Sequence, residues 1–128
     1  MEEALNALRP LFEDPAILKI GQNLKYDMLV LHKAPYSASL SPIDDTMVMS
    51  FVLDAGRWGH GMDELSKRHF DLQPIAYKDV VGSGKQQVTF DKVPLKSACN
   101  YAAEDADITI QLWNLFKASL LLSLINIS

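Results

Sequence analysis

The sequence has 128 residues, which is the size of a single domain and is long enough to bury a hydrophobic core. Hydrophobic residues make up 48% and charged residues 22%, as in ordinary soluble globular proteins. The net charge of −4 argues against a protein that grips duplex DNA by broad phosphate neutralisation, since such proteins are basic. Any contact with nucleic acid is therefore expected to be local, through a metal-holding acidic cleft and stacking side chains.

The two ends of the sequence and its single cysteine bear on the cellular compartment of the protein. The N-terminus is acidic and lacks an apolar signal core, and the apolar run at residues 120–127 is shorter than the about 20 residues that span a bilayer. Cys99 has no partner for an intrachain disulfide, so we expect it to be a small buried core residue. These features predict a cytoplasmic protein that does not enter a membrane.

The first part of the chain predicts helix, strand and helix. Apolar residues at helical spacing over residues 5–12 predict an opening helix, which Pro15 ends. Residues 17–20 predict a short buried strand that Gly21 closes. Helical spacing resumes at Leu24 and stops before Pro35.

The middle of the chain predicts two shorter helices. Residues 37–44 are expected to form a loop with room for a short extended piece, and Asp45 is expected to cap a helix over residues 46–53. Glycines mark a flexible connection over residues 56–61, and residues 62–69 predict another short helix.

The last part of the chain predicts one long helix. Residues 71–90 are expected to be irregular, and Pro94 suits the first turn of the final helix. The expected apolar face of that helix consists of Leu95, Ala98, Ala102, Thr109, Leu112, Trp113, Phe116 and Leu120. Only one strand is predicted firmly, and a lone buried strand leaves its backbone groups unpaired. Further strands must therefore be missing from this chain or come from another copy.

Two short segments carry polar residues at helical spacing. In residues 21–27 (GQNLKYD), Asn23 and Asp27 lie one helical turn apart; in residues 101–107 (YAAEDAD), Tyr101 and Asp105 do the same. Alone, each pair is weak evidence, because an asparagine near a helix start is usually a cap and a helical aspartate is usually solvated.

Together the two segments resemble the second and third exonuclease motifs of family A DNA polymerases, the DNA polymerase I type. The segments between them, 45–47 (DTM), 60–65 (HGMDEL) and 82–90 (GSGKQQVTF), are similar to that family in the same order. The resemblance covers residues 1–117, a partial 3′→5′ exonuclease domain, and leaves residues 118–128 as a divergent apolar tail.

The resemblance implies an α/β fold, a truncated ribonuclease H-like (DnaQ-like) exonuclease fold that is mostly helical with a reduced sheet. It also implies proofreading in DNA replication and repair by the DEDDy class of nuclease. In that class four carboxylates hold two divalent metal ions, Mg²⁺ or Mn²⁺, at the 3′ end of single-stranded DNA.

The family's roles transfer to individual positions. Asp27 and Asp105 would be catalytic metal ligands, and the hydroxyl of Tyr101 would orient the attacking water. Contacts with the terminal nucleotides would come from Gln22, Asn23, Tyr26, Tyr77 and, in a looser local alignment, Arg57. The remaining polar residues near the motifs are expected to have no role in the chemistry: Glu104 and Asp107 as solvent-facing neighbours, His60 and His69 without ligand spacing.

The chain departs from the family at its start. The family's first motif is Asp-x-Glu on an early strand, and residues 1–20 contain no such strand. With two of four metal ligands missing, we expect hydrolysis to be very weak or absent and the metal to be weakly bound or absent. The open sheet edge or an apolar helix face is expected to favour a homodimer.

Two alternatives stay open. One is a non-catalytic remnant that self-associates or binds single strands weakly. The other is a ribonuclease D-like exonuclease, which shares the spacing of Tyr101 and Asp105; residues 21–27 favour the polymerase family over it.

Overall fold

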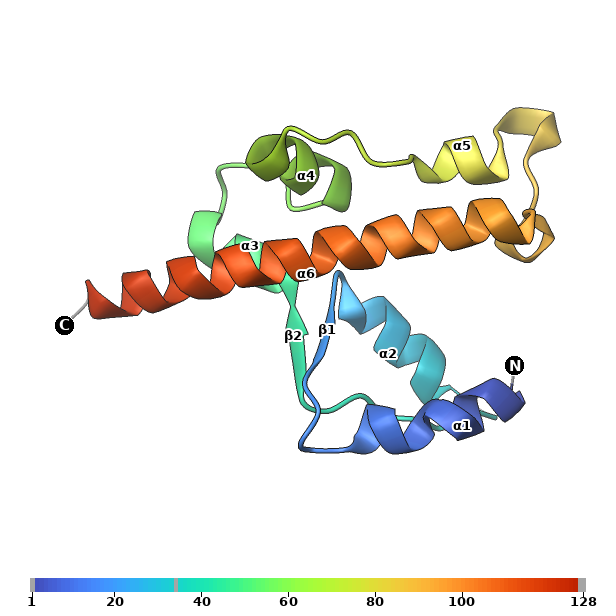
Figure 1. The fold of residues 1–128 in the computed structure, drawn as a ribbon, viewed down its shortest axis with the longest axis horizontal. Coiled ribbons are helices and arrows are strands. Elements are labelled where there is room, and N and C mark those ends of the chain that lie inside the picture. Colours follow the sequence, from blue (N-terminus) through green and yellow to red (C-terminus); the bar gives the residue numbers. More distant parts are fainter. Residues whose placement is uncertain (1, 34, 127–128) are drawn as a thin grey trace.

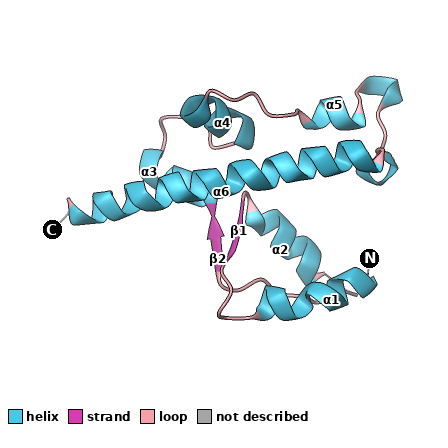
Figure 2. Cartoon of the chain, viewed as in Figure 1, coloured by secondary structure: helices cyan, strands magenta, loops and turns pink. Residues whose placement is uncertain are grey.

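The fold is organised around one long helix against which four of the other elements pack, as the computed structural model shows for residues 2–33 and 35–126 (Figure 1). Figure 2 shows that helices dominate and that the strands are confined to one short pair. In chain order the elements are α1 (Glu2–Glu13), β1 (Lys19–Gly21), α2 (Leu24–His32), β2 (Ile43–Asp45), α3 (Thr46–Asp54), α4 (Met62–Phe70), α5 (Tyr77–Val81), the 3₁₀ turns η1 (Gly84–Gln86) and η2 (Phe90–Lys92), and α6 (Leu95–Ile125).

The sheet consists of two parallel strands joined through α2. Lys19 lies opposite Ile43 and Gly21 opposite Asp45, and each strand has only one partner strand in the described part of the chain. The predicted strand is therefore present, but it begins two residues later than expected, and the short extended piece before the third helix is its partner β2. A two-stranded sheet of this kind leaves an unpaired edge on both sides.

Asp45 fixes the starts of two helices. Its Oδ1 accepts hydrogen bonds from the backbone N–H groups of Met47 and Asn23, both at 2.9 Å, and its Oδ2 accepts one from Leu24 N–H at 2.8 Å. The first bond confirms Asp45 as the N-cap of α3. The other two hold the start of α2, where Asn23 adopts a left-handed conformation with φ 58° and makes no side-chain cap of its own.

The hydrophobic core lies where α6 crosses α3 and α4. Its centre is the buried cluster of Leu65, Ile108, Leu112 and Phe116. The sequence prediction was correct at Leu112 and Phe116 but did not include Ile108. It was wrong for Leu95, which is 85% exposed, because the first turn of α6 extends beyond the core.

Cys99 is exposed, so the prediction that it is buried was wrong. It lies in the same N-terminal part of α6, where the neighbour is α5 rather than the core helices (Figure 1). The helical period of the sequence predicted the apolar face of α6, but it did not show over which part of the helix other elements cover that face.

The segment predicted to be irregular, residues 71–90, contains α5 and η1. Its anchor is Glu104, whose Oε2 accepts a hydrogen bond of 2.7 Å from the backbone N–H of Ile75. Glu104 is therefore not a solvent-facing bystander, as predicted, but ties the segment before α5 to α6. Short helices such as α5 depend on these tertiary contacts, which local sequence does not reveal.

Helix α6 is long and apolar enough to cross a membrane by length and composition alone, although a core helix of a soluble protein passes the same test. Here α6 packs against α3, α4, α5 and β1. Its last turns are uncovered within the described residues: Leu121, Leu122 and Leu124 are 54%, 63% and 65% exposed.

Candidate active site

A pocket of about 440 Å³ opens beside β1, where the starts of α2 and α4 face the middle of α6. It contains two carboxylates, Asp27 from the first turn of α2 and Asp105 from α6. The remaining lining residues are Ile20, Gly21, Gln22, Met62, Ala106, Thr109 and Ile110. The fold thus brings together the acids of the two sequence motifs, although a long stretch of chain separates them.

Tyr101 joins this pair through Asp105, one helical turn along α6. The two side chains are hydrogen-bonded, and burial together with the negative charge of Asp105 raises the pKa of the Tyr101 phenol. The phenol therefore stays protonated at neutral pH. It is available as a hydrogen-bond donor beside the carboxylate.

Both acids have raised pKa values for the same main reason, loss of hydration in the pocket. For Asp105, burial raises the pKa most, the hydrogen bond from Tyr101 opposes it, and the nearby charges of Glu104 and Asp63 raise it further. For Asp27, partial burial of the carboxyl group raises the pKa most, although the residue as a whole is exposed. A backbone hydrogen bond lowers the pKa, and the negative charge of Asp45 raises it further. Neither acid forms an ion pair within the described residues. Partly buried carboxylates without a counter-charge favour a bound proton or a cation.

The donor set suits a hard divalent cation, because carboxylate oxygens are the ligands that Mg²⁺ prefers and Mg²⁺ keeps several waters of its own. Asp27 and Asp105 are the residues that would hold it. However, the described residues contain no group of three or more His, Cys, Asp or Glu positioned for one metal ion. The fit is therefore to a weakly held cation.

Gln22 has a fixed orientation at the rim of the pocket. Its Nε2 donates to the backbone carbonyl of His60 at 2.8 Å, and its Oε1 accepts from the hydroxyl of Thr46. The Thr46 side chain is fully buried and also reaches the carbonyl of Gly21 at 3.1 Å, while Ser50 bonds Nδ1 of His60 at 2.7 Å. Sequence reasoning missed this network; the polar Thr46 and Ser50 on an otherwise apolar helix were its only signal.

The other residues predicted to bind substrate lie outside the pocket lining. Asn23 and Tyr26 are exposed near the start of α2, and Tyr26 is 69% exposed. Tyr77 lies beside Tyr101, with ring centroids 6.0 Å apart. Arg57 is exposed in the connection between α3 and α4.

The raised pKa of Asp105 predicts a pH-dependent stability effect. A carboxyl group with a higher pKa in the folded state holds its proton more tightly there than in the unfolded chain, so its ionisation destabilises the fold as the pH rises above its ordinary value of 3.8. Asp105→Asn should therefore gain stability over the wild type increasingly between about pH 4 and neutrality. Urea unfolding followed by circular dichroism over this range measures it. Asp107→Asn, exposed on the same helix, is the control, and an Asp105→Asn gain independent of pH would contradict the expectation.

Comparisons with known proteins show the family of the chain. A family model described as 3′-5′ exonuclease matches residues 1–121. Over 120 residues the chain is 52% identical to DNA polymerase I of Rhizobium leguminosarum, and over 112 residues it is 43% identical to DNA polymerase I of Pseudomonas aeruginosa. These matches cover 94% and 87% of this chain but only 12% of each relative, so the chain spans a small part of the length of those proteins. The chain belongs to the 3′-5′ exonuclease domain family of A-type DNA polymerases.

Proposed function

We propose that this chain carries part of a proofreading exonuclease site that hydrolyses 3′-terminal nucleotides of single-stranded DNA. The observation that supports this most is the shared pocket of Asp27 and Asp105, with Tyr101 hydrogen-bonded to the second acid. The 3′-5′ exonuclease family model that matches this chain and its similarity to DNA polymerase I of Rhizobium leguminosarum support the same reading. The fold would then be a truncated ribonuclease H-like one with a reduced sheet.

In this proposal each residue acts at a stated atom. The carboxylates of Asp27 and Asp105 would hold divalent cations, which would supply stabilisation of the negative charge that develops on the phosphodiester oxygens. The protonated phenol of Tyr101 orients the attacking water, since its raised pKa keeps the hydroxyl intact at neutral pH. Gln22 would contact the terminal nucleotide through the second N–H of its Nε2, since the first N–H bonds His60 and its Oε1 accepts from Thr46.

The remaining strand contacts are proposals of the same kind. Asn23 and Tyr26 meet the nucleotides from the exposed start of α2, Tyr77 from α5 and Arg57 from the α3–α4 connection. A cytoplasmic location and a homodimer through the open sheet edge or an apolar helix face also stay predictions. The unpaired outer edges of β1 and β2 and the exposed leucines at the end of α6 support the second of these.

Two acids are few ligands for a divalent cation, so this chain by itself is expected to release nucleotides very slowly. A non-catalytic single-strand-binding module is therefore the second candidate. It is favoured by the lack of any three-residue metal group in the described part of the chain.

Nucleotide release from an end-labelled single strand, titrated with Mg²⁺ and Mn²⁺, tests the proposal. We expect slow, metal-dependent release that Asp27→Asn and Asp105→Asn each abolish and that Tyr101→Phe reduces. Asp107→Asn should leave it unchanged, because this side chain is exposed and bonds only Gln111 on its own helix.

The same titration separates the two candidates. Release that persists in both Asp27→Asn and Asp105→Asn would show the site assignment to be wrong. No release from the wild type, with strand binding retained, would favour the non-catalytic module. If a polypeptide that adds an Asp-x-Glu strand to this pocket releases nucleotides rapidly, loss of that activity in the same two variants becomes the sharper measurement.

A further inference from the structure

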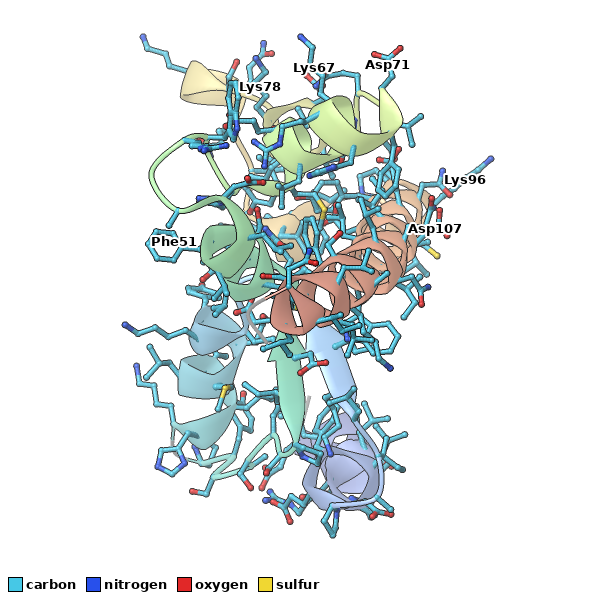
Figure 3. All side chains as sticks on the ribbon, turned by 90° about the vertical axis from the view of Figure 1, so that its left-hand side faces the viewer. Phe51, Lys67, Asp71, Lys78, Lys96 and Asp107 are labelled. Carbon is cyan, nitrogen blue, oxygen red and sulfur yellow. The ribbon has the colours of Figure 1, made fainter. Side chains whose placement is uncertain are left out.

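Two hydroxyl groups are buried on one face of α3, behind the pocket of Asp27 and Asp105. Thr46 and Ser50 lie one helical turn apart and are 0% and 1% exposed, and neither lines the pocket. Figure 3 shows the neighbouring Phe51 projecting outward from α3, on the side away from α6. A buried hydroxyl costs free energy unless it is hydrogen-bonded, so the partners of these groups indicate what they do.

The partner of Thr46 is the side-chain amide of Gln22. The hydroxyl lies closer to Oε1 of Gln22 than to the carbonyl oxygen of Gly21, which is 3.1 Å away, and it has only one hydrogen to donate. On the other side of the amide, Nε2 donates to the carbonyl oxygen of His60 at 2.8 Å. Because a carbonyl oxygen only accepts, this bond determines which end of the amide is the nitrogen.

Both ends of the Gln22 amide are therefore held by residues that do not line the pocket, whereas Gln22 itself does. The second N–H of Nε2 has no hydrogen-bond partner within residues 2–33 and 35–126, so it is a donor in a pocket whose charged groups are two acids. A phosphate oxygen accepts from such a donor. An amide turned by 180° would present its oxygen instead, which repels phosphate.

We propose that Thr46 is a positioning residue, whose hydroxyl holds the Gln22 amide in the orientation in which its second N–H meets a phosphate of a bound single strand. This inference rests on the proposed function, since it takes Gln22 as a contact of the terminal nucleotide. Thr46 acts through Gln22, because its own side chain is fully buried. Without the hydroxyl, Oε1 loses its donor and only the bond to His60 holds the amide.

The test measures the affinity of the whole chain for a single strand of thymidines with fluorescein at its 5′ end. Fluorescence anisotropy in Mg²⁺ follows binding before the expected slow release shortens the strand. Gln22→Ala should weaken binding about tenfold, as expected for one hydrogen bond to a charged group. Thr46→Val removes the hydroxyl at nearly constant volume and should weaken binding about threefold to tenfold, whereas Thr46→Ser keeps the hydroxyl and should bind like the wild type.

A double-mutant cycle separates positioning from a structural role. In the Gln22→Ala background, Thr46→Val should have no further effect on affinity, because the amide that the hydroxyl holds is gone. The matched control is Ser66→Ala. Ser66 is also 0% exposed, but its hydroxyl donates to the carbonyl oxygen of Met62 on its own helix, so this variant should bind like the wild type. Urea unfolding of each variant shows that affinity and stability change independently.

The possible failures of the inference and of the proposed function differ. If Gln22→Ala weakens binding but folded Thr46→Val binds like the wild type, the positioning role is wrong while the proposed function stands. An equal loss from Thr46→Val with and without Gln22 would also overturn the inference. If the wild type binds no strand, or if Gln22→Ala binds like the wild type, the Gln22 contact fails and the inference fails with it. Thr46→Ala removes the same hydroxyl and replaces Thr46→Val in each comparison if the valine variant does not fold.

Discussion

Replacing Asp45 by alanine is expected to lower the free energy of unfolding by about 2–4 kcal/mol, since hydrogen bonds to a charged group contribute more than neutral ones and an N-cap alone contributes about 1 kcal/mol. The carboxylate accepts from three backbone N–H groups, those of Asn23, Leu24 and Met47, at 2.8–2.9 Å. Alanine leaves all three donors without this partner. Urea unfolding followed by far-UV circular dichroism measures the loss.

Asp45→Ala should also disturb the position of Asp27. This residue lies in the first turn of α2, and two of the lost hydrogen bonds hold the start of that helix. Asp45→Asn retains an acceptor oxygen without the charge and should lie between alanine and wild type. Asp91→Ala, an exposed acid outside the strands and α-helices, is the matched control and should change stability by less than about 0.5 kcal/mol. A loss for Asp45→Ala no larger than that control would contradict its role in holding both helix starts.

The second large effect is expected in the core. Leu112→Ala should lower the free energy of unfolding by about 2–5 kcal/mol, because it removes buried methyl groups and leaves a cavity that rigid neighbours fill only partly. Leu112 is 0% exposed and packs with Leu65, Ile108 and Phe116. A domain of this size has roughly 5–15 kcal/mol of stability in total, so the variant should lose a substantial part of it.

Leu121→Ala offers the control for the core prediction on the same helix. Leu121 is 54% exposed, so its truncation should change the stability little. Equal losses at Leu112 and Leu121, measured by urea unfolding, would mean that the C-terminal turns of α6 are covered in solution, for instance by a second copy. In that case the hydrophobic core in solution would include the C-terminal turns of α6 and would be that of a dimer.

Local signals predicted much of the helical structure. The opening helix, the cap at Asp45 and the glycine-bounded α4 depend on residues within one or two turns, and sequence reports those interactions directly. The strand β2 was only a short extended piece in the sequence, because three residues are too few to establish a period. Helix α5 was missed because its anchor, Glu104, lies 29 positions from Ile75.

The sequence analysis named the two acids that line the pocket, Asp27 and Asp105, but not the bonds that support the site. The pairing of Asp27 with Asp105 came from resemblance to a family, since nothing in the spacing of two distant segments places them in one pocket. The bonds that hold Gln22 come from Thr46 and His60, 24 and 38 positions away. Nothing in the sequence around Gln22 indicated that Thr46 and His60 would form hydrogen bonds with it. Long-range hydrogen bonds of this kind depend on the assembled fold.

The arrangement around α6 has a consequence for biosynthesis. Three of the four residues at the centre of the core, Ile108, Leu112 and Phe116, lie on the last element of the chain, so α3 and α4 cannot complete a core until that element has left the ribosome. Until then the apolar faces of the earlier helices stay uncovered in the nascent chain, where they are targets for holdase chaperones or for aggregation. Translation that stalls before residue 108 would yield a polypeptide that contains Asp27 but lacks the three α6 residues that pack against Leu65.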